Sequence, residues 1–288
     1  MANQLDSLKG WSPTAPAKLA SVPTCPTLSV ASGKGGVGKS HLTLSVGLAL
    51  ADLGKRVLLV DGDMGLANLH ILCGTYPQHD LEDILNGRCL PEEALLSIGA
   101  GIDLLPSASG VANLSALPPE RIGALARSLA GLQSNYDIMI VDTGAGIGDT
   151  TMNLVLASDR MLLVTTQEPT AQADAYAFLK VMRSHRRDLP VHLCVNMGSS
   201  EEEAIQSGLR LSQVSSRFLG WEPTWAGWIP RQPGLERFTL ERKPAFRASP
   251  EGPFARAVRQ LARETVRDLV GMGPGFFSKL GDGGKLLA

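Results

Sequence analysis

The sequence predicts an α/β fold, in which helices cover both faces of a mainly parallel β-sheet, preceded by a flexible N-terminal extension. Three observations support this prediction. Short, unbroken apolar runs alternate with longer stretches of helical periodicity, as is typical of parallel strands buried on both faces. A glycine-rich loop, Ser32–Ser40, follows the first apolar run. Aspartates follow two later runs where each one ends, and parallel sheets bind their ligands at that edge.

Composition limits the class of protein. The chain has 288 residues, a formal net charge of −1, 44% hydrophobic residues and 19% charged residues. This is enough for one large core, and the balanced charge gives no general reason to expect a nucleic-acid partner. The four cysteines are far apart, which argues against a disulfide framework or a metal cluster. With no apolar run of ~20 residues and no secretory signal, we expect a soluble, cytoplasmic protein.

The N-terminal residues do not fit the α/β pattern. Residues 1–11 place Leu5, Leu8 and Trp11 at helical spacing, whereas residues 12–27 contain four prolines among Ala, Thr and Ser. Such a composition cannot bury enough surface to order itself, so residues 12–27 are predicted to be a linker. Residues 1–11 are then either a flexible terminus or a peptide that a partner binds.

The predicted core spans residues 28–271. Strands are expected at Leu28–Ala31, Val57–Val60, Ile102–Leu105, Ile138–Val141, Met161–Thr165, Val191–Val195 and Thr224–Ile229. Helices are expected at Lys39–Leu53, Pro119–Leu132, Asp149–Leu156, Thr170–His185, Glu202–Phe218 and Pro253–Val270.

The loop after the first strand has the spacing of a phosphate-binding loop. Gly33 is followed by four residues and then by Gly38, Lys39 and Ser40. Glycines let successive backbone N–H groups face a phosphate, and the helix that begins at Gly38–Lys39 adds its positive end. Lys39 can reach the β- and γ-phosphates, and the Ser40 hydroxyl can bind Mg²⁺. The sequence therefore predicts a nucleoside triphosphate site built from Gly33, Lys34, Gly35, Gly36, Val37, Gly38, Lys39, Ser40 and His41.

Three aspartates follow strand ends beside this loop. Asp61 and Asp63 follow the second strand, and Asp142 ends the Ile138–Val141 run. We expect Asp61 and Asp142 near the metal ion and Asp63 near an attacking water. The alternative for any single one of them is a helix cap or a turn residue.

Lys34 is a second lysine inside the loop. A phosphate loop needs only its terminal lysine, so Lys34 points away from its own helix. It is either a solvated surface cation or a cation that reaches a phosphate across a dimer interface, where it would neutralise charge during γ-phosphate loss.

Lys34–Ser40 resembles the deviant phosphate loop of the MinD/ParA class of ATPases, and Asp61–His70 is similar to the segment after their second strand. Two further stretches, Asp142–Asp149 and Thr165–Tyr176, resemble the flagellar-number regulators called FlhG, FleN or YlxH. The resemblance extends from about residue 28 to about residue 269. It implies a P-loop ATPase that dimerises with two ATP molecules between its subunits.

The resemblance also implies roles for particular residues. Lys39 would hold phosphates in its own subunit, and Lys34 would reach the partner's nucleotide. Ser40, Asp61 and Asp142 would hold Mg²⁺, and Asp63 would orient the hydrolytic water. Asn196 matches the position that reads adenine, and Pro230 and Arg231 would line the base.

Three surface features suggest partners. The family often carries an N-terminal segment that stimulates the flagellar GTPase FlhF, and Asn3–Lys9 is a degenerate match to it. The tail, residues 272–288, has Phe276 and Phe277 and is either a weak membrane-targeting segment on the inner face of the cell membrane or a packed or disordered end. Arginines recur at helical spacing, which is typical of a solvated helix face and, alternatively, of non-specific DNA binding: Arg256, Arg259, Arg263 and Arg267.

Three functions compete. The first is a slow ATPase whose ATP-dependent homodimerisation regulates flagellar number or placement, through FlhF or a flagellar transcription regulator. The second is a DNA-partitioning or division-site ATPase of the same fold. The third is a scaffold that does not hydrolyse ATP, and the presence of Asp63 and both lysines argues against it.

Overall fold

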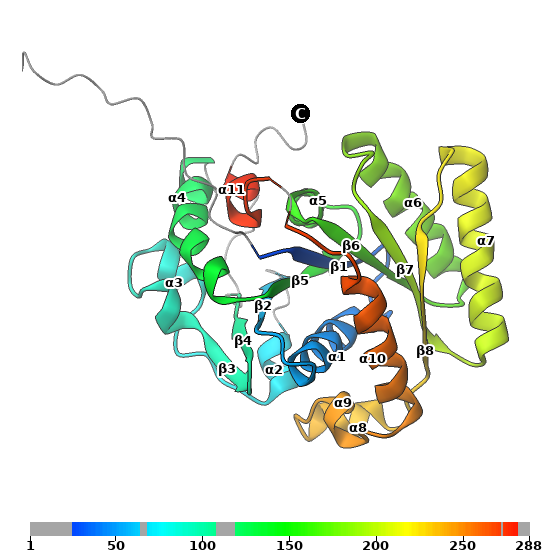
Figure 1. The fold of residues 1–288 in the computed structure, drawn as a ribbon, viewed down its shortest axis with the longest axis horizontal. Coiled ribbons are helices and arrows are strands. Elements are labelled where there is room, and N and C mark those ends of the chain that lie inside the picture. The colour runs from blue at the N-terminus through cyan, green and yellow to red at the C-terminus, as the bar shows by residue number, and fades with distance from the viewer. Residues whose placement is uncertain (1–24, 64–67, 108–118, 272, 282–288) are drawn as a thin grey trace, which may run out of the picture.

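The computed structural model describes residues 25–63, 68–107, 119–271 and 273–281. Within these ranges the chain forms one eight-stranded sheet with the order β3-β4-β2-β5-β1-β6-β7-β8 (Figure 1). The strands are β1 (Thr27–Ser32), β2 (Val57–Gly62), β3 (Leu96–Gly99), β4 (Ile102–Leu105), β5 (Ile138–Ala145), β6 (Arg160–Thr165), β7 (Val191–Gly198) and β8 (Thr224–Pro230). Every neighbouring pair is parallel except β3 and β4, so the predicted mainly parallel sheet is confirmed.

Helices cover both faces of this sheet (Figure 1). The longer helices are α1 (Lys39–Asp52), α4 (Pro119–Leu129), α5 (Asp149–Ala157), α6 (Pro169–His185), α7 (Glu201–Leu219) and α10 (Pro253–Val266). The short ones are α2 (Leu69–Cys73), α3 (Leu81–Leu85), α8 (Leu235–Leu240), α9 (Ala245–Ala248), α11 (Phe276–Gly281) and the 3₁₀ turns η2 (Pro91–Ala94) and η4 (Ala130–Asn135).

The central strands are buried on both faces, as their continuous apolar sequences require. In β1, β2 and β6 every residue is buried. Side chains that alternate along a strand pack into different clusters: Val30 and Leu162 pack with α1 and α10, and Ala31 and Leu163 pack with α5, α6 and α7. A strand that is buried on both faces has no side chains facing water. Its sequence is therefore a continuous apolar run rather than an alternation of apolar and polar residues.

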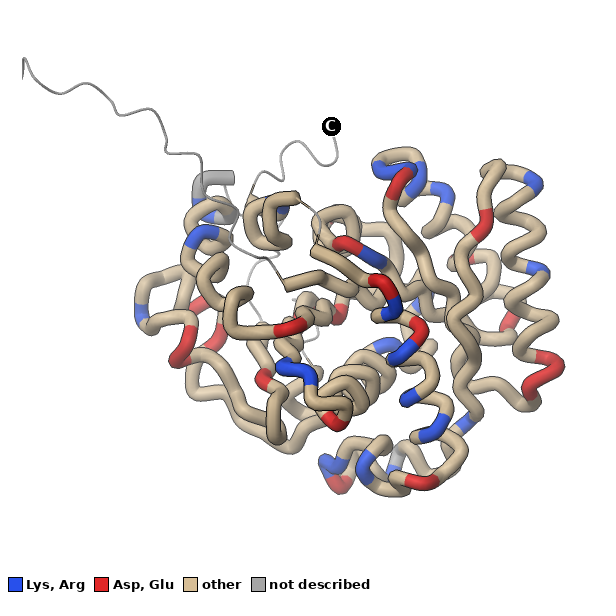
Figure 2. The backbone as a smooth tube through the Cα atoms, viewed as in Figure 1, with Lys and Arg blue, Asp and Glu red and all other residues tan. Residues whose placement is uncertain are grey.

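Helix α10 has the solvated basic face predicted for it. Val258 and Leu261 lie in the core, while Arg256, Arg263 and Arg267 are exposed. Arg259, the fourth arginine of the predicted face, is half-buried and donates a 2.7 Å hydrogen bond to the Pro250 carbonyl. Figure 2 shows several basic positions along this helix.

The structure departs from the sequence prediction in short elements and at several boundaries: β5 extends to Ala145 and β7 to Gly198, whereas α4 ends at Leu129 and α10 at Val266. Strand β3 pairs antiparallel with β4 at the edge of the sheet, and sequence alone did not predict it. Strand β3 has only four residues, and two of them are exposed. It therefore lacks the run of apolar residues by which the other strands were predicted. Strand β1 starts at Thr27, one residue before the predicted start and inside the predicted linker. The predictions for residues 1–24 lie outside the described residues.

The first part of the C-terminal tail is packed against the domain. Phe276 and Phe277 of α11 are 1% and 2% exposed and lie in the cluster formed with α4. Lys279 donates a 2.7 Å hydrogen bond to Asp159, and a Cβ on Gly281 would lie 3.1 Å from the Cβ of Ala126. The membrane interpretation counted both phenylalanines as exposed, and on that point it is wrong. Their burial follows from the close approach of α11 to α4.

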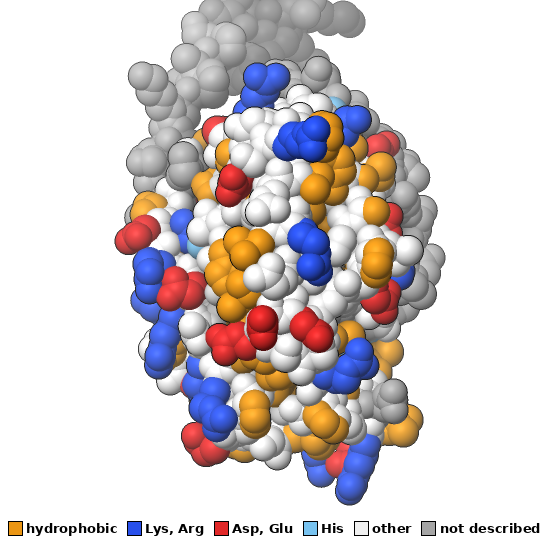
Figure 3. All heavy atoms as spheres, turned by 90° about the vertical axis from the view of Figure 1, so that its right-hand side faces the viewer, with side chains coloured by type: hydrophobic (Ala, Val, Ile, Leu, Met, Phe, Trp, Pro, Cys, Tyr) orange, Lys and Arg blue, Asp and Glu red, His pale blue; other side chains and the backbone are white. Residues whose placement is uncertain are grey.

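One side of the molecule is formed by α6, α7 and β8. Several large apolar side chains stay exposed there: Leu209, Val214, Phe218 and Trp225. Figure 3 shows apolar and basic side chains interspersed over this face. Among the helices of the described ranges, none combines the length and the apolar character needed to span a bilayer.

Candidate nucleotide-binding site

The predicted site residues meet at the carboxyl ends of the central strands. The strand register pairs Asp61 on β2 with Asp142 on β5. Gly62 allows this close approach, because a Cβ there would lie 2.6 Å from the Asp142 carbonyl oxygen. Asp63 follows at the same edge, and its Oδ1 lies 3.8 Å from the position of a Cβ on Gly144. The chain thus places its three aspartates at the ends of two neighbouring strands, beside β1.

The loop between β1 and α1 needs its glycines for two different reasons. Gly36 and Gly38 have φ angles of 79° and 80°, a left-handed conformation that other residues adopt with strain. Gly33 packs against α6, because a Cβ there would lie 2.2 Å from the carbonyl oxygen of Asp174. Helix α1 begins at Lys39 without a side-chain cap, so its first N–H groups have no side-chain acceptor. Such a helix end can bind a phosphate.

Lys39 forms a buried ion pair with Asp142. Its Nζ lies 2.9 Å from Asp142 Oδ1, and the side chain is 7% exposed. Thr43, one turn further along α1, donates a 2.8 Å hydrogen bond to the same oxygen. One carboxylate oxygen therefore accepts two hydrogen bonds from α1. For Lys39 to reach a phosphate it must leave Asp142, and Thr43 then remains to orient that carboxylate.

Asp61 is held by backbone groups. Its Oδ1 accepts from the Asp63 N–H, and its Oδ2 accepts from the N–H groups of Asn68 and Leu69, at 3.1 to 3.2 Å. Burial, and then the neighbouring charge of Asp142, raise the pKa of Asp61 to about 7, although these hydrogen bonds lower it. A cation between the two aspartates would relieve both effects.

Lys34 belongs to the phosphate loop, but its side chain points to α6. Its Nζ donates to Glu168 at 3.0 Å and to Thr170 at 2.9 Å. Both acceptors belong to the first turn of α6 and the residue before it. Lys34 is thus not a free cation, and it does not point to the site where Lys39 lies. It is paired with Glu168 and Thr170 of its own subunit.

The predicted base-binding residues surround the other side of the loop. Asn196 is 6% exposed and donates a 2.8 Å hydrogen bond to the carbonyl of Val37. The next residue, Met197, has a φ of 56°, which turns the chain sharply at the end of β7. Arg231 donates its N–H to Gly198, which places Pro230 and Arg231 beside this turn. That these residues read adenine stays a prediction.

His41 faces α8. Its Nε2 lies 3.2 Å from the Thr239 hydroxyl, and burial lowers its pKa. The imidazole therefore joins the start of α1 to the segment after β8.

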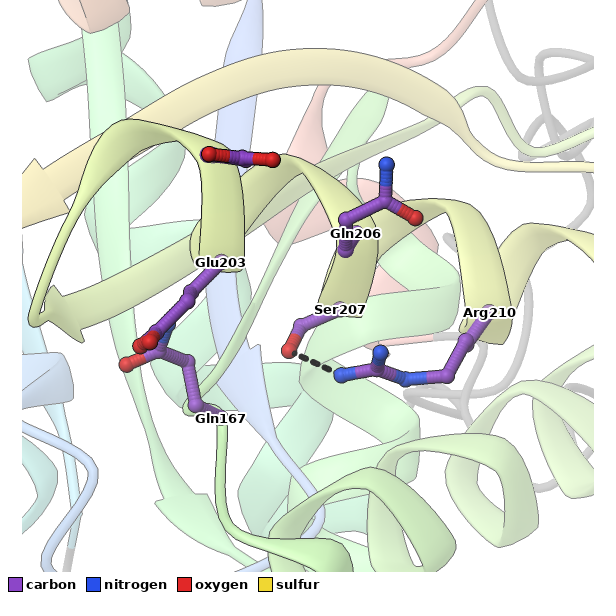
Figure 4. Close-up of a pocket in the computed structure, with 6 residues that line it drawn as sticks. Gln167, Glu203, Gln206, Ser207 and Arg210 are labelled. Atoms are coloured by element: carbon purple, nitrogen blue, oxygen red, sulfur yellow. Dashed lines mark hydrogen bonds between the residues drawn. The ribbon is translucent and has the colours of Figure 1, made fainter.

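A cavity of about 560 Å³ lies next to the site, between the start of α6 and the first turns of α7 (Figure 4). Its lining is polar throughout: Gln167, Glu202, Glu203, Gln206, Ser207 and Arg210. Gln167, the residue before Glu168, accepts a 2.9 Å hydrogen bond from Ser199. The cavity therefore borders the segment that holds Lys34.

Three side chains of the site were missed by the sequence prediction: Thr43, Glu168 and Thr170. Thr43 lies four residues after Lys39, so both fall on the same face of α1. That spacing could have revealed it. Glu168 and Thr170 lie in a stretch that carried the family resemblance, but their contact with Lys34 depends on where α6 packs.

The residues present fit a magnesium ion. Asp142 Oδ1 accepts hydrogen bonds from Lys39 and Thr43, and Ser40 lies in the first turn of α1, at the same edge of the sheet as both aspartates. Carboxylate and hydroxyl oxygens are the ligands that Mg²⁺ prefers, together with phosphates and water. Over the described ranges, no three or more His, Cys, Asp or Glu side chains form a complete metal site.

Comparison with known proteins agrees with this geometry. A family model described as an AAA domain matches residues 26–194. The chain is 34% identical to the antiactivator FleN of Pseudomonas aeruginosa over 82% of this chain and 85% of that protein. It is 32% identical to the flagellum site-determining protein YlxH of Helicobacter pylori over 84% and 82% of the two chains. The septum site-determining protein MinD of Pyrococcus horikoshii, solved with Mg-ADP, superposes with a TM-score of 0.69 at 28% identity over 83% of this chain and 95% of that one.

Proposed function

The chain belongs to the FleN/YlxH group of MinD/ParA-class P-loop ATPases, and we propose that it is a dimerisation switch in which ATP closes two subunits around a pair of composite sites. The observation that carries this proposal is the position of Lys34. It lies in the phosphate loop, yet its ammonium group is turned to Glu168 and Thr170. A cation placed there is available to a second molecule's nucleotide.

The proposed hydrolysis transfers the γ-phosphoryl group of ATP to water. The bond between the γ-phosphorus and the bridging oxygen breaks, and a new bond forms to the water oxygen. Asp63 orients that water, and the backbone N–H groups of Gly33–Ser40 cradle the phosphates. Lys39 leaves Asp142 to hold the β- and γ-phosphates. Ser40, Asp61 and Asp142 would hold Mg²⁺, which when bound would supply positive charge to the phosphate oxygens.

Lys34 completes the site in this proposal. Charge builds up between the β- and γ-phosphates as the bond breaks, and a cation from the partner subunit stabilises it. Before dimerisation Lys34 stays on Glu168, in a contact where the lysine side chain is 38% exposed and the glutamate side chain is 67% exposed. Such an exposed ion pair contributes little and is readily exchanged for phosphate oxygens. ATP hydrolysis is then slow in the monomer and faster in the dimer.

A mixing experiment tests whether Lys34 acts across the interface. Lys34→Ala keeps Lys39 and Asp63 but supplies no lysine to its partner. Asp63→Ala supplies Lys34 but cannot orient water in its own site. Each variant alone is expected to be nearly inactive, whereas an equimolar mixture regains part of the wild-type ATPase rate, because one of the two sites in the mixed dimer is complete. A mixture no more active than its components would show that Lys34 acts within its own subunit.

The cellular role we propose is control of flagellar number or placement. It rests on two relatives, one named an antiactivator and the other a flagellum site-determining protein. The partner we propose is a flagellar transcription regulator or the GTPase FlhF, with residues 1–11 as the contact to the GTPase. Deleting residues 1–11 is expected to abolish stimulation of GTP turnover and to leave ATP hydrolysis unchanged. If the chain without residues 1–11 stimulates GTP turnover as strongly as the full chain does, that part of the proposal is wrong.

A further inference from the structure

The segment that follows the last strand reaches back to the phosphate loop. Strand β8 ends at Pro230, and α8 follows it with Thr239 near its end. In the sheet, β6 and β7 lie between β8 and β1, the strand that precedes the loop. Figure 1 shows α8 and α9 beside α1, the helix that follows the loop. We call residues 231–239, which connect β8 to this contact, the 231–239 segment.

Both ends of the 231–239 segment are anchored by hydrogen bonds. At its start, the Arg231 N–H donates to the Gly198 carbonyl at 3.0 Å, at the end of β7. At its end, the Thr239 hydroxyl lies 3.2 Å from Nε2 of His41, which belongs to the first turn of α1. One anchor is therefore on the strand that carries the predicted base-reading amide, and the other is on the phosphate loop.

The direction of the hydrogen bond between His41 and Thr239 follows from the other contact of this hydroxyl. The Thr239 hydroxyl donates its single hydrogen to the Leu235 carbonyl at 3.0 Å. Toward His41 it can therefore only accept, so Nε2 of the imidazole carries the hydrogen and donates it. A protonated imidazole also has a hydrogen on Nε2, so this contact does not depend on the charge of His41.

Helix α8 buries little apolar surface. It has six residues, and its apolar residues Leu235 and Phe238 are only partly buried against the core. Leu240, its last residue, is 83% exposed. An element that buries little apolar surface opens at a low cost in free energy, so a single hydrogen bond can decide where it lies.

A second contact attaches the next helix, α9, to the other end of α1. Arg247 of α9 pairs with Asp52, the last residue of α1, through two nitrogen–oxygen contacts of 2.8 Å. Asp52 lies about 16 Å further along the axis of α1 than His41 does. The ion pair thus fastens the same part of the chain to the same helix, far from the phosphate loop. It provides an internal comparison for the contact that His41 makes.

We propose that His41 is a positioning residue for the base of the nucleotide. Through Thr239 it fixes the 231–239 segment, which begins at the residues proposed to line the base, Pro230 and Arg231. A wall that is already in place stabilises base binding, because less conformational freedom is lost when the ligand arrives. The phosphates contact the loop itself and do not depend on this wall. This inference rests on the proposed nucleotide site and assigns the imidazole to its base side.

The test compares ADP with inorganic pyrophosphate, each bound to the full chain in the presence of Mg²⁺. Pyrophosphate has two linked phosphates, as ADP does, but it lacks the base and the ribose. The ratio of the two affinities, which we call the base preference, therefore measures the base side of the site. Displacement of a fluorescent ADP analogue gives both affinities, and circular dichroism verifies that each variant is folded.

Four variants and one double variant are compared with wild type. His41→Ala and Thr239→Val each remove the hydrogen bond, and the double variant combines them. In His41→Gln the side-chain amide nitrogen takes the place of Nε2 and can still donate to Thr239. Arg247→Gln breaks the distant ion pair and is the matched control.

We expect His41→Ala and Thr239→Val each to lower the affinity for ADP about tenfold and that for pyrophosphate at most about twofold. The double variant should lose no more ADP affinity than either single variant, because both substitutions remove the same contact. His41→Gln and Arg247→Gln should keep the base preference of wild type.

Equal losses of ADP and pyrophosphate affinity in His41→Ala would overturn the proposal, because the imidazole would then act on the loop. A fall in the base preference of Arg247→Gln as large as that of His41→Ala would overturn it too, as would a His41→Gln protein that behaves like His41→Ala. If wild type fails to bind ADP, the proposed nucleotide site is wrong as well. If wild type binds ADP and both His41→Ala and Thr239→Val keep its base preference, this inference alone is wrong.

Discussion

Thr43 illustrates how one hydroxyl can matter to a site that it does not line. It is fully buried and donates to the Asp142 oxygen that also pairs with Lys39. In the proposed mechanism Lys39 moves to a phosphate, and Thr43 then keeps Asp142 oriented toward the metal ion. Its role is positional, and its effect should appear in metal-dependent binding.

Thr43→Val removes that hydrogen bond at nearly constant volume. We expect ADP affinity in the presence of Mg²⁺ to fall about tenfold, because a hydrogen bond to a charged group is lost in a buried site. Affinity measured with EDTA should change much less. A fluorescent ADP analogue reports both values, and Thr43→Ser, which keeps the hydroxyl, is the control. Equal losses with and without Mg²⁺ would contradict the positioning role.

We propose that Asp61 makes metal binding depend on pH. Its raised pKa of about 7 means that the carboxyl is largely neutral at pH 6 and largely ionised at pH 8. Only the ionised form attracts a cation, so Mg²⁺ must displace a proton at the lower pH. We expect Mg²⁺ affinity of the ADP-bound protein to rise about tenfold from pH 6 to pH 8 and then level off. Mg²⁺ titrations that give one affinity throughout this range would show that Asp61 is already ionised at pH 6.

At the scale of elements, α11 shows what a sequence can and cannot reveal. A membrane-binding segment and a packed chain end both need apolar residues beside a cation. The sequence of Phe276, Phe277 and Lys279 therefore fits either interpretation. What decides between them is a matching surface on α4 and a carboxylate at Asp159, which lie 120 or more residues earlier in the chain. The sequence around α11 gives no sign of these distant contacts. A membrane role for this segment would require α11 to leave its site.

The packing of α11 predicts a large effect on stability. Phe277→Ala is expected to lower the free energy of unfolding by about 3–5 kcal/mol, since it removes a buried ring and leaves a cavity. Equilibrium denaturation in urea measures this change, and Leu240→Ala, an exposed apolar position, should change it little. A Phe277→Ala protein as stable as wild type would mean that α11 is not bound to the domain in solution.

The predictability of the other elements follows from how they are stabilised. The seven predicted strands and the six longer helices are recognisable because each carries its own apolar periodicity. Strand β3 and the short helices α2, α3, α8 and α9 are only four to six residues long, too short to show such a periodicity. The same division applies to the site. Gly33–Ser40, Asp61 and Asp142 follow strand ends and were predictable, whereas Glu168 meets Lys34 only because α6 packs against Gly33.

At the scale of the whole molecule, we propose that the site is one half of a composite site formed by two chains. Everything needed to bind ATP lies at one edge of the sheet, with the loop on β1 and the aspartates on β2 and β5. Lys34 is the exception, because within its own subunit it contacts α6 rather than the loop. A second copy of the chain would give that lysine a phosphate to bind. The central claim is therefore that the active unit contains two chains and that hydrolysis separates them.

Gel filtration with light scattering of wild type and Asp63→Ala, each with ATP and Mg²⁺, tests this claim directly. Asp63→Ala should bind ATP without hydrolysing it and accumulate as a dimer, whereas wild type should return to monomer as its ATP is consumed. Lys34→Ala should stay monomeric, since its dimer lacks the bridging cations. Asp63→Ala that elutes as a monomer with ATP, like wild type, would contradict the two-chain account.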